Sequence, residues 1–247
     1  MSYASEVLAD SPLAYWRLGD ASGTTATDSS GNSRPGTYVS SPTLGAGSLV
    51  GSDLTNTAMT VGANSGQCCS TASASWMNVS ALTVECLANI TSAVDGSNGD
   101  ALVSRYDGSG FNWLLWRNTS GLLAFQIRNN SGTAYDITGP SVTLGLTYHV
   151  AATFDGSNVA LYVAGASVAS TTVTGTVQTG SAPIDIGRYS GSSVTIPGAT
   201  FDEVAIYGTA LSAGRVATHY AATLVPANPS FQKLPTSPVA RLRAATR

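Results

Sequence analysis

The sequence predicts an all-β fold in which two antiparallel sheets pack as a sandwich or jelly roll. Short apolar runs recur along the chain with turn residues between them, and 26 glycines favour short strands joined by turns. The segment HVAATFDGSNVALYVAG, residues 149–165, shows this pattern most clearly. With 247 residues, the chain is long enough for one large domain with a sizeable core.

Residues 149–165 are expected to form a β-hairpin around the sequence DGSN. Asp155 and Gly156 are expected to supply the left-handed backbone angles of a tight turn. Before the turn, Val150, Ala152 and Phe154 can share one face. After the turn, apolar side chains alternate in the same way: Val159, Leu161 and Val163 on one face, Ala160, Tyr162 and Ala164 on the other. None of these residue types is catalytic, so the hairpin is expected to build the core.

The other elements follow in order along the chain. Residues 1–20 predict a turn or short helix and then a strand centred on LAYWRL, and the glycine- and serine-rich residues 21–36 predict a loop. Residues 211–222, LSAGRVATHYAA, predict a short helix capped by Ser212. Strands are predicted at 57–61, 66–71, 81–90, 100–106, 111–117, 121–128, 133–137, 147–154, 158–164, 166–173, 182–188 and 201–207.

The C-terminal residues differ from the rest in composition. Four prolines fall between Pro226 and Pro238, which predicts an extended arm over residues 225–247 after a domain of residues 1–224. We expect this arm to dock on a partner protein. The predicted docking residues are Phe231, Leu234, Val239, Arg241, Leu242, Arg243 and Arg247.

Charge is sparse and unevenly distributed. Charged residues make up 10% of the chain, below the roughly 25% of ordinary soluble proteins. Up to residue 203 there are fourteen acidic and six basic residues, a net charge of −8, whereas the remainder has five basic residues and no acid. The domain is therefore expected to repel nucleic acid, while the arm could bind an acidic surface.

The N-terminal sequence MSYASEVLADSPLAYWRLGD has no basic region followed by a long apolar stretch, so it is not expected to be a secretory signal peptide. No segment reaches the ~18 apolar residues of a membrane span, and no membrane partner is expected.

The three cysteines, Cys68, Cys69 and Cys86, make a poor disulfide framework, because their number is odd and two are adjacent. We expect free, buried thiols and assembly in a reducing cytoplasm. With His149 and His219 as the only histidines, a zinc site is not expected.

Several segments together resemble one family. They are YWRLGDASGTTATDSSGNSRPGTY, ALTVECLA, YHVAATFDGSNVALYVAG, IGR at 186–188 and FDEVAIYGTALSAGRVATHY. In this order they are similar to a laminin-G-like, concanavalin A-type jelly roll of the bacterial and phage branch, over about residues 11–222. The resemblance implies two packed antiparallel sheets, with FDEVAIY beside the N-terminal strand and a short helix closing one end.

The same superfamily contains glucanases, so hydrolysis is one implied function. A retaining glycosidase needs two carboxylates roughly 5 Å apart. Asp202 and Glu203 are adjacent and are expected to point to opposite faces of a strand, so they cannot form this pair alone. No catalytic residues are predicted, and the protein is not expected to be an enzyme.

The resemblance also implies a possible structural calcium ion, with Asp28 and Asp202 as candidate ligands and no other cofactor. The alternative is that Asp28 makes an Asx turn and Asp202 caps a strand end.

Carbohydrate binding is a third implied function, with Trp113 and Trp116 as candidate rings for stacking on a sugar. In FNWLLWRN these two residues have opposite strand parity, so at most one can face a given surface.

The opening LADSPLAYWRLGD resembles openings of structural proteins of tailed phages. We therefore expect a non-enzymatic virion protein, assembled in the host cytoplasm and released by lysis. A capsid decoration protein that docks on the major capsid protein through its arm is the first hypothesis, and a tail-associated lectin that binds a host surface glycan is the alternative.

Overall fold

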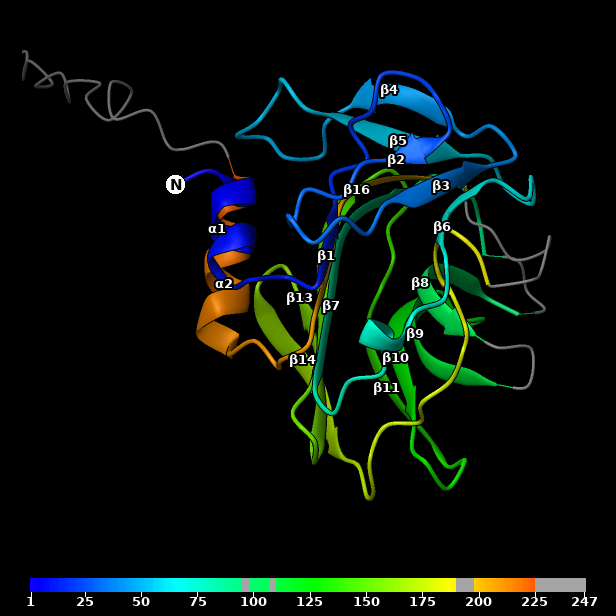
Figure 1. Cartoon of the computed structure of the whole chain (residues 1–247), viewed down its shortest axis with the longest axis vertical. Helices are drawn as coiled ribbons and strands as arrows, with labels where there is room; N and C mark the ends of the chain where they lie inside the picture. The colour runs from blue at the N-terminus through cyan, green and yellow to red at the C-terminus, as the bar shows by residue number, and fades with distance from the viewer. Residues whose placement is uncertain (95–97, 107–109, 190–197, 225–247) are drawn as a thin grey trace, which may run out of the picture.

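The structure, a computed structural model, describes residues 1–94, 98–106, 110–189 and 198–224. Within these residues, sixteen strands form two antiparallel sheets that pack face to face (Figure 1). One helix precedes the first strand and another follows the last. The predicted all-β sandwich with a C-terminal helix is confirmed. The predicted docking arm, residues 225–247, lies outside the described residues.

Sheet A has the strand order β14-β13-β12-β7-β16-β5-β4, and β1 also pairs with β16. The first half of β16 pairs with β5 and its second half with β1, so the N-terminal strand lies beside the C-terminal one. The strands of sheet A are β1 (Ala14–Trp16), β4 (Thr43–Gly47), β5 (Thr57–Val61), β7 (Leu82–Ile90), β12 (Thr147–Phe154), β13 (Asn158–Val163), β14 (Ala166–Thr172) and β16 (Ala199–Tyr207).

Sheet B has the strand order β11-β10-β9-β8-β15-β6-β3-β2. Its strands are β2 (Thr25–Ala26), β3 (Gly36–Val39), β6 (Cys68–Thr71), β8 (Asp100–Tyr106), β9 (Phe111–Arg117), β10 (Leu122–Arg128), β11 (Ala134–Ser141) and β15 (Ile184–Ile186). A 3-10 helix, η1 (Ser75–Met77), lies between β6 and β7.

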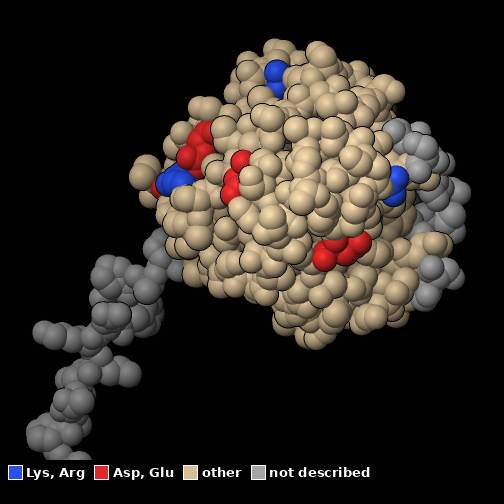
Figure 2. Space-filling view, turned by 90° about the horizontal axis from the view of Figure 1, so that it is seen from below, with Lys and Arg blue, Asp and Glu red and all other residues tan. Residues whose placement is uncertain are grey.

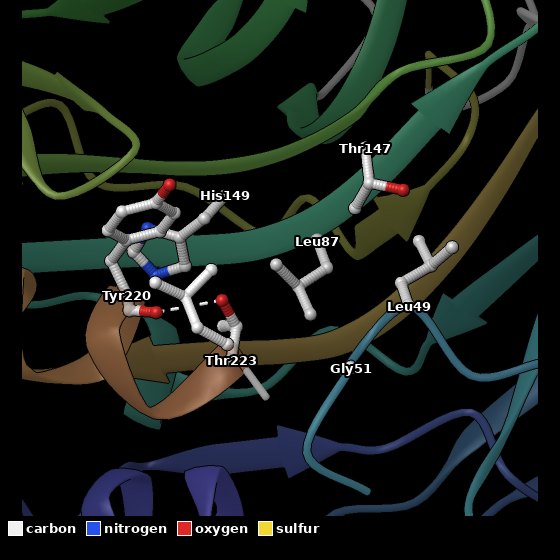
Figure 3. Close-up of a pocket in the computed structure, with 8 residues that line it drawn as sticks. Leu49, Gly51, Leu87, Thr147, His149, Tyr220 and Thr223 are labelled. Atoms are coloured by element: carbon white, nitrogen blue, oxygen red, sulfur yellow. Dashed lines mark hydrogen bonds between the residues drawn. The ribbon is translucent and has the colours of Figure 1, made fainter. Parts of the chain in front are cut away.

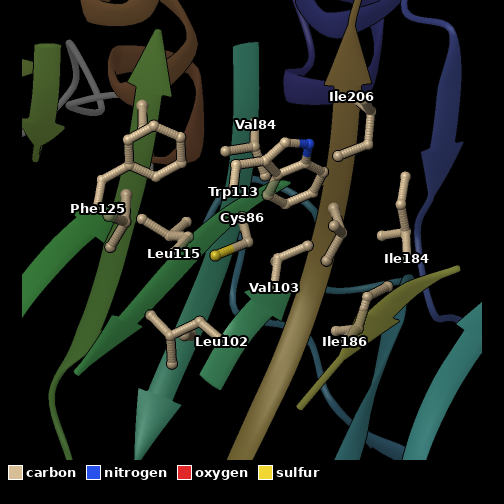
Figure 4. Close-up of a cluster of buried hydrophobic side chains, with 14 of the residues drawn as sticks. Val84, Cys86, Leu102, Val103, Trp113, Leu115, Phe125, Ile184, Ile186 and Ile206 are labelled. Carbon is tan, nitrogen blue, oxygen red and sulfur yellow. The ribbon is translucent and has the colours of Figure 1, made fainter. Parts of the chain in front are cut away.

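The core fills the space between the two sheets (Figure 4). Val84 and Cys86 of β7 and Ile206 of β16 meet Leu115 of β9 and Phe125 of β10, and all five are buried. Alternation along each strand places every second side chain in this layer. The buried aliphatic and aromatic side chains supply the main favourable free energy of folding.

The hairpin at residues 149–165 is present as predicted, with β12 and β13 in register. Gly156 has a φ of 99°, but Asp155 does not adopt a left-handed conformation. Instead, the Asp155 carboxylate accepts hydrogen bonds from the backbone N–H groups of Ser157 and Asn158. The expectation of two left-handed residues is wrong, because an Asx turn fixes the loop with one.

Each of the twelve predicted strands is present, and the sequence does not predict β2, β3 or β4. The two residues of β2 fall within the predicted loop 21–36. β4 is an edge strand with two glycines and no buried side chain. Such short or exposed strands lack the alternation of apolar and polar residues by which strands are recognised.

The two helices, α1 (Tyr3–Ala9) and α2 (Ala213–Thr223), lie together on the outer face of sheet A (Figure 1). Ser212 caps α2 as predicted, because its Oγ accepts from the backbone N–H of Arg215. Tyr3 of α1 and Val216 of α2 pack in a second apolar cluster against Leu87 of β7. The helix after the last strand therefore covers a sheet face together with α1, and the implied closure of one end of the sandwich is wrong.

Figure 2 shows a face with few charged side chains, as the composition predicts. Cys68, Cys69 and Cys86 are free and buried, which confirms the predicted state of the thiols. No helix among the described residues is long and apolar enough to cross a membrane.

Candidate functional site

The outer face of sheet B faces away from the core. On β10, Leu123, Phe125 and Ile127 fill the core, so the alternate residues Gln126 and Arg128 point outward. The registers place further side chains on the same face: Trp116, Leu114 and Asn112 of β9, Ser104 of β8 and Asp185 of β15. This set, with Gln126 and Arg128, is called the outer face of sheet B below.

Five polar atoms on or beside this face are buried and have no hydrogen-bond partner among the described residues. They are Nε1 of Trp116, Oδ1 of Asn112, Nε of Arg128, Oε1 of Gln178 and Oδ1 of Asp185. A buried polar atom left without a partner costs about 1–3 kcal/mol, and such atoms are uncommon in folded proteins. The five include both donors and acceptors, so this face has unused capacity for hydrogen bonds of both kinds.

A pocket of about 500 Å³ lies at the end of this face, where β10 turns into β11. We call it the polar pocket; its lining residues are Arg128, Asn130, Ser131, Gly132, Gln178 and Thr179. Two of the five atoms without partners, Arg128 Nε and Gln178 Oε1, belong to this lining. The pocket therefore combines a cation, amides and hydroxyls.

Hydrogen bonds hold the walls of the polar pocket in place. The Asn129 side chain accepts from the backbone N–H groups of Ser131 and Thr133, which fixes the turn. The backbone N–H of Gln178 donates to the carbonyl of Arg128 at 2.8 Å, and the Asn112 amide donates to the carbonyl of Gln178 at 2.8 Å. The pocket is thus largely preformed, as ligand sites usually are.

Aromatic side chains lie on the same side of sheet B. The ring of Phe111 packs between those of Tyr106 and Tyr189, with centroid distances of 4.6 and 5.2 Å. Trp116 is half-buried and packs with this group.

Trp113 lies on the opposite face of the strand from Trp116. It is 2% exposed and belongs to the core (Figure 4). The prediction that Trp113 could stack on a sugar is therefore wrong, because β9 turns this ring inward. Trp116 keeps the outward orientation that stacking requires.

A second pocket, of about 310 Å³, lies on sheet A beside α2 (Figure 3). It is lined by Leu49, Gly51, Leu87, Thr147, His149, Tyr220, Thr223 and Leu224. The ring of Tyr220 packs near that of His149, with centroids 5.9 Å apart. Three leucines contribute to the lining, so this pocket is more apolar than the polar pocket.

A buried ionic cluster lies behind this second pocket. Glu85 of β7 accepts a hydrogen bond from the Tyr3 hydroxyl, and its carboxylate lies 3.2 Å from His149 Nε2 and 3.0 Å from His219 Nδ1. Burial alone would raise the pKa of Glu85, but the two histidines lower it well below its usual range. Asp10 Oδ2 lies 2.9 Å from His219 Nε2. These contacts join α1, α2 and the sheet.

The sequence does not reveal this cluster, because its members are far apart along the chain. Glu85 lies within the strand pattern of ALTVECLA, and His219 lies in the predicted helix. The one available signal is that a charged residue interrupts an otherwise apolar strand, which indicates a buried partner.

Asp202 and Glu203 lie close together, which overturns the expectation that they point to opposite faces. Glu203 has a φ of 55°, and the register with β7 shifts between Asp202 and Ala205, so a β-bulge breaks the alternation here. The Asn56 amide donates to both carboxylates, at 3.0 and 3.2 Å. Glu203 also accepts from Tyr15 and pairs with Arg17. Burial and the charge of Glu203 raise the pKa of Asp202 to about 8.

The two candidate calcium ligands bind protein donors instead. Asp28 accepts backbone hydrogen bonds from Tyr15, Ser30 and Arg34, which includes the alternative Asx turn. Asp202 accepts from the backbone N–H of Leu49 and the hydroxyl of Ser48. The described residues contain no group of three or more His, Cys, Asp or Glu side chains that could hold a metal ion.

The comparisons with known proteins identify the family. A model of the concanavalin A-like lectin/glucanase superfamily matches residues 52–217, and the chain belongs to this superfamily. No match was found among curated proteins.

Solved structures share the fold at low sequence identity. The binding domain of Paraclostridial Mosquitocidal Protein 1 is 16% identical with a TM-score of 0.64, over 86% of this chain and 52% of that one. The ligand binding domain of botulinum neurotoxin serotype D, solved with N-acetylneuraminic acid, is 12% identical with a TM-score of 0.69, over 89% and 52%. A Trypanosoma rangeli sialidase is 15% identical with a TM-score of 0.61, over 85% and 32%. This chain thus spans about half or less of each of these structures.

Proposed function

We propose that this protein is a non-catalytic carbohydrate-binding domain and that the polar pocket of sheet B holds the sugar. The observation that carries the proposal is the group of buried donors and acceptors without partners at and beside this pocket. A sugar ring carries many hydroxyl groups, each of which can donate one hydrogen bond and accept two. Such a ligand can form hydrogen bonds with unpartnered donors and with unpartnered acceptors at the same time.

The comparisons support a binding role. The chain belongs to a superfamily of lectins and glucanases, and two structures of the same fold are binding domains, one of them solved with a sugar. Those structures are larger than this chain, and their ligands are properties of the whole proteins. They favour the lectin hypothesis over a purely structural capsid role.

The second pocket fits a sugar less well. Leu49, Leu87 and Leu224 contribute apolar walls, and Glu85 behind it is already bonded to Tyr3 and both histidines. Trp116 could extend the polar site along sheet B. It lies on the same face as Arg128. The register places Asn112 of β9 opposite Arg128, and Trp116 lies four residues, or about 13 Å, farther along β9. An oligosaccharide could therefore reach both.

We propose that the domain is part of a phage virion, where it serves on the tail as a lectin for adsorption to the host. This proposal rests on the sequence motif at the N-terminus and on the composition of residues 225–247. Decoration of a capsid through the arm is the competing proposal. The two differ in whether binding to a host glycan is part of the function.

A glycan array tests the proposed function. The labelled full-length protein should bind a subset of bacterial surface glycans, and Gln178→Ala should weaken binding by about five- to tenfold, because one hydrogen bond is lost. Gln67→Ala is the matched control: its amide is bonded to Gly62 and Ser41, away from sheet B's polar pocket, so binding should not change. Absence of binding to every glycan, or equal losses in both variants, would contradict the proposal.

A further inference from the structure

Arg128 differs from the other arginines of the described residues. Arg17, Arg117, Arg188 and Arg215 each form an ion pair with a carboxylate. Arg34 donates to the carbonyl of Leu13, and Arg105 donates to three carbonyls and Asn78. The side chain of Arg128 has no hydrogen bond or ion pair with any described residue, and its Nε is buried.

The described residues around Arg128 do not supply an anion for it. No acidic side chain is among the described residues that line the polar pocket. Asp136, which points outward on the adjacent strand β11, accepts from the Gln126 amide at 2.8 Å. The guanidinium of Arg128 therefore places a positive charge in the pocket wall that no described carboxylate pairs with.

The orientation of the guanidinium is restricted on one side. A Cβ at position 110 would collide with Nη1 and Cζ of Arg128, so the group packs directly against the backbone of Gly110. Nη2 of Arg128 lies slightly farther from that Cβ position, at 3.0 Å. Through Nε and one Nη, a guanidinium offers two parallel donors that match the two oxygens of a carboxylate.

We propose that the sugar held in this pocket is acidic, and that its carboxylate pairs with Arg128. The inference rests on the proposed carbohydrate-binding function and names the class of sugar. The carboxylate accepts from the Arg128 guanidinium, while a ring hydroxyl donates to Oε1 of Gln178. One ligand class thus pairs with the charge of Arg128 and with the free acceptor of Gln178.

The test compares sugars that differ only in charge. Binding of glucuronic acid and N-acetylneuraminic acid to the full-length protein is measured by saturation-transfer NMR and calorimetry, beside the methyl ester of each acid. The acids should bind about ten- to a hundredfold more tightly than the esters, because a charge-assisted bond is replaced by a neutral contact. Added salt should reduce the difference.

Variants of Arg128 test whether the preference for acid over ester depends on this side chain. Arg128→Gln should abolish the preference for acid over ester, and Arg128→Lys should restore part of the preference. Arg34→Gln, on a residue outside the pocket, should keep the preference.

The outcomes separate the inference from the proposed function. Equal binding of acid and ester would overturn the acidic-sugar inference and leave carbohydrate binding standing. Tighter binding of a sulfated sugar such as glucose 6-sulfate would also overturn it, because the anion would not be a carboxylate. No binding of any acid, ester or neutral glycan would overturn both.

Discussion

Nδ1 of His219 lies 3.0 Å from Oε2 of Glu85, and both side chains are buried between sheet A and the two helices. The other ring nitrogen of His219 faces Asp10 at 2.9 Å. Each nitrogen faces a carboxylate, which favours the doubly protonated imidazolium, while Nη2 of Arg215, 3.4 Å from Nε2, opposes it. Burial lowers the pKa of His219, but Glu85 and Asp10 together raise it by more. The pKa of His219 therefore lies above its usual value. This cation fastens α2 to β7 and to the end of α1.

The pH dependence of stability follows from these shifts. The stabilisation from His219 is fully present below its unfolded pKa of about 6.5 and is lost as pH rises through its higher folded pKa. The stabilisation from Glu85 is present above about 4.3 and is lost as pH falls through its lower folded pKa. Urea unfolding across pH should therefore show greatest stability between these limits. The His219→Gln variant should lose the decline on the alkaline side. A decline of the same size in wild type and variant would contradict the assignment.

Trp113 and Trp116 should respond differently to truncation. Trp113→Ala should destabilise the fold by about 3–5 kcal/mol, because it leaves a cavity between the sheets. Trp116→Ala should cost less, since this ring is half-buried outside the core, and should weaken binding of oligosaccharides. Denaturant unfolding and a binding assay on both variants measure this contrast. Equal destabilisation would show that the outer ring is a second structural anchor.

Arg17 should stabilise the fold by pairing with the buried carboxylate of Glu203. Arg17→Gln leaves Glu203, whose side chain is 0% exposed, without its cation, and should cost about 3–5 kcal/mol at neutral pH. Burial already raises the pKa of Glu203, so the loss should shrink at acidic pH, where this carboxyl is protonated. Arg34→Gln serves as the control without a carboxylate partner. A loss independent of pH would indicate a packing effect of Arg17 instead.

The segment after α2 should be dispensable for folding. A chain ending at Leu224 keeps both sheets and both helices, so it should unfold at the same temperature as the full chain. On the virion proposal, the shortened chain should fail to attach to particles that lack the protein. Attachment equal to that of the full-length protein would contradict the docking role of Phe231, Leu234 and the arginines of the arm.

The strands and the hairpin could be predicted because they depend on local patterns. Alternation at Val150, Ala152 and Phe154 identifies a core face, and opposite strand parity separates the buried Trp113 from the half-buried Trp116. The site depends on contacts between distant residues. The bulge at Glu203 reverses the expected alternation without a glycine to mark it, and Arg128 and Gln178 meet across 50 positions of the chain. Charge and hydrogen-bond capacity at such a place follow only from the three-dimensional arrangement.

The most direct test of the central claim is a crystal structure of the full-length protein with the glycan that it binds most tightly on the array. The sugar should occupy the polar pocket, with its oxygens within hydrogen-bond distance of Arg128 and Gln178. A sugar bound in the pocket beside α2, or one that leaves both of these side chains without a new partner, would contradict the assignment of the site.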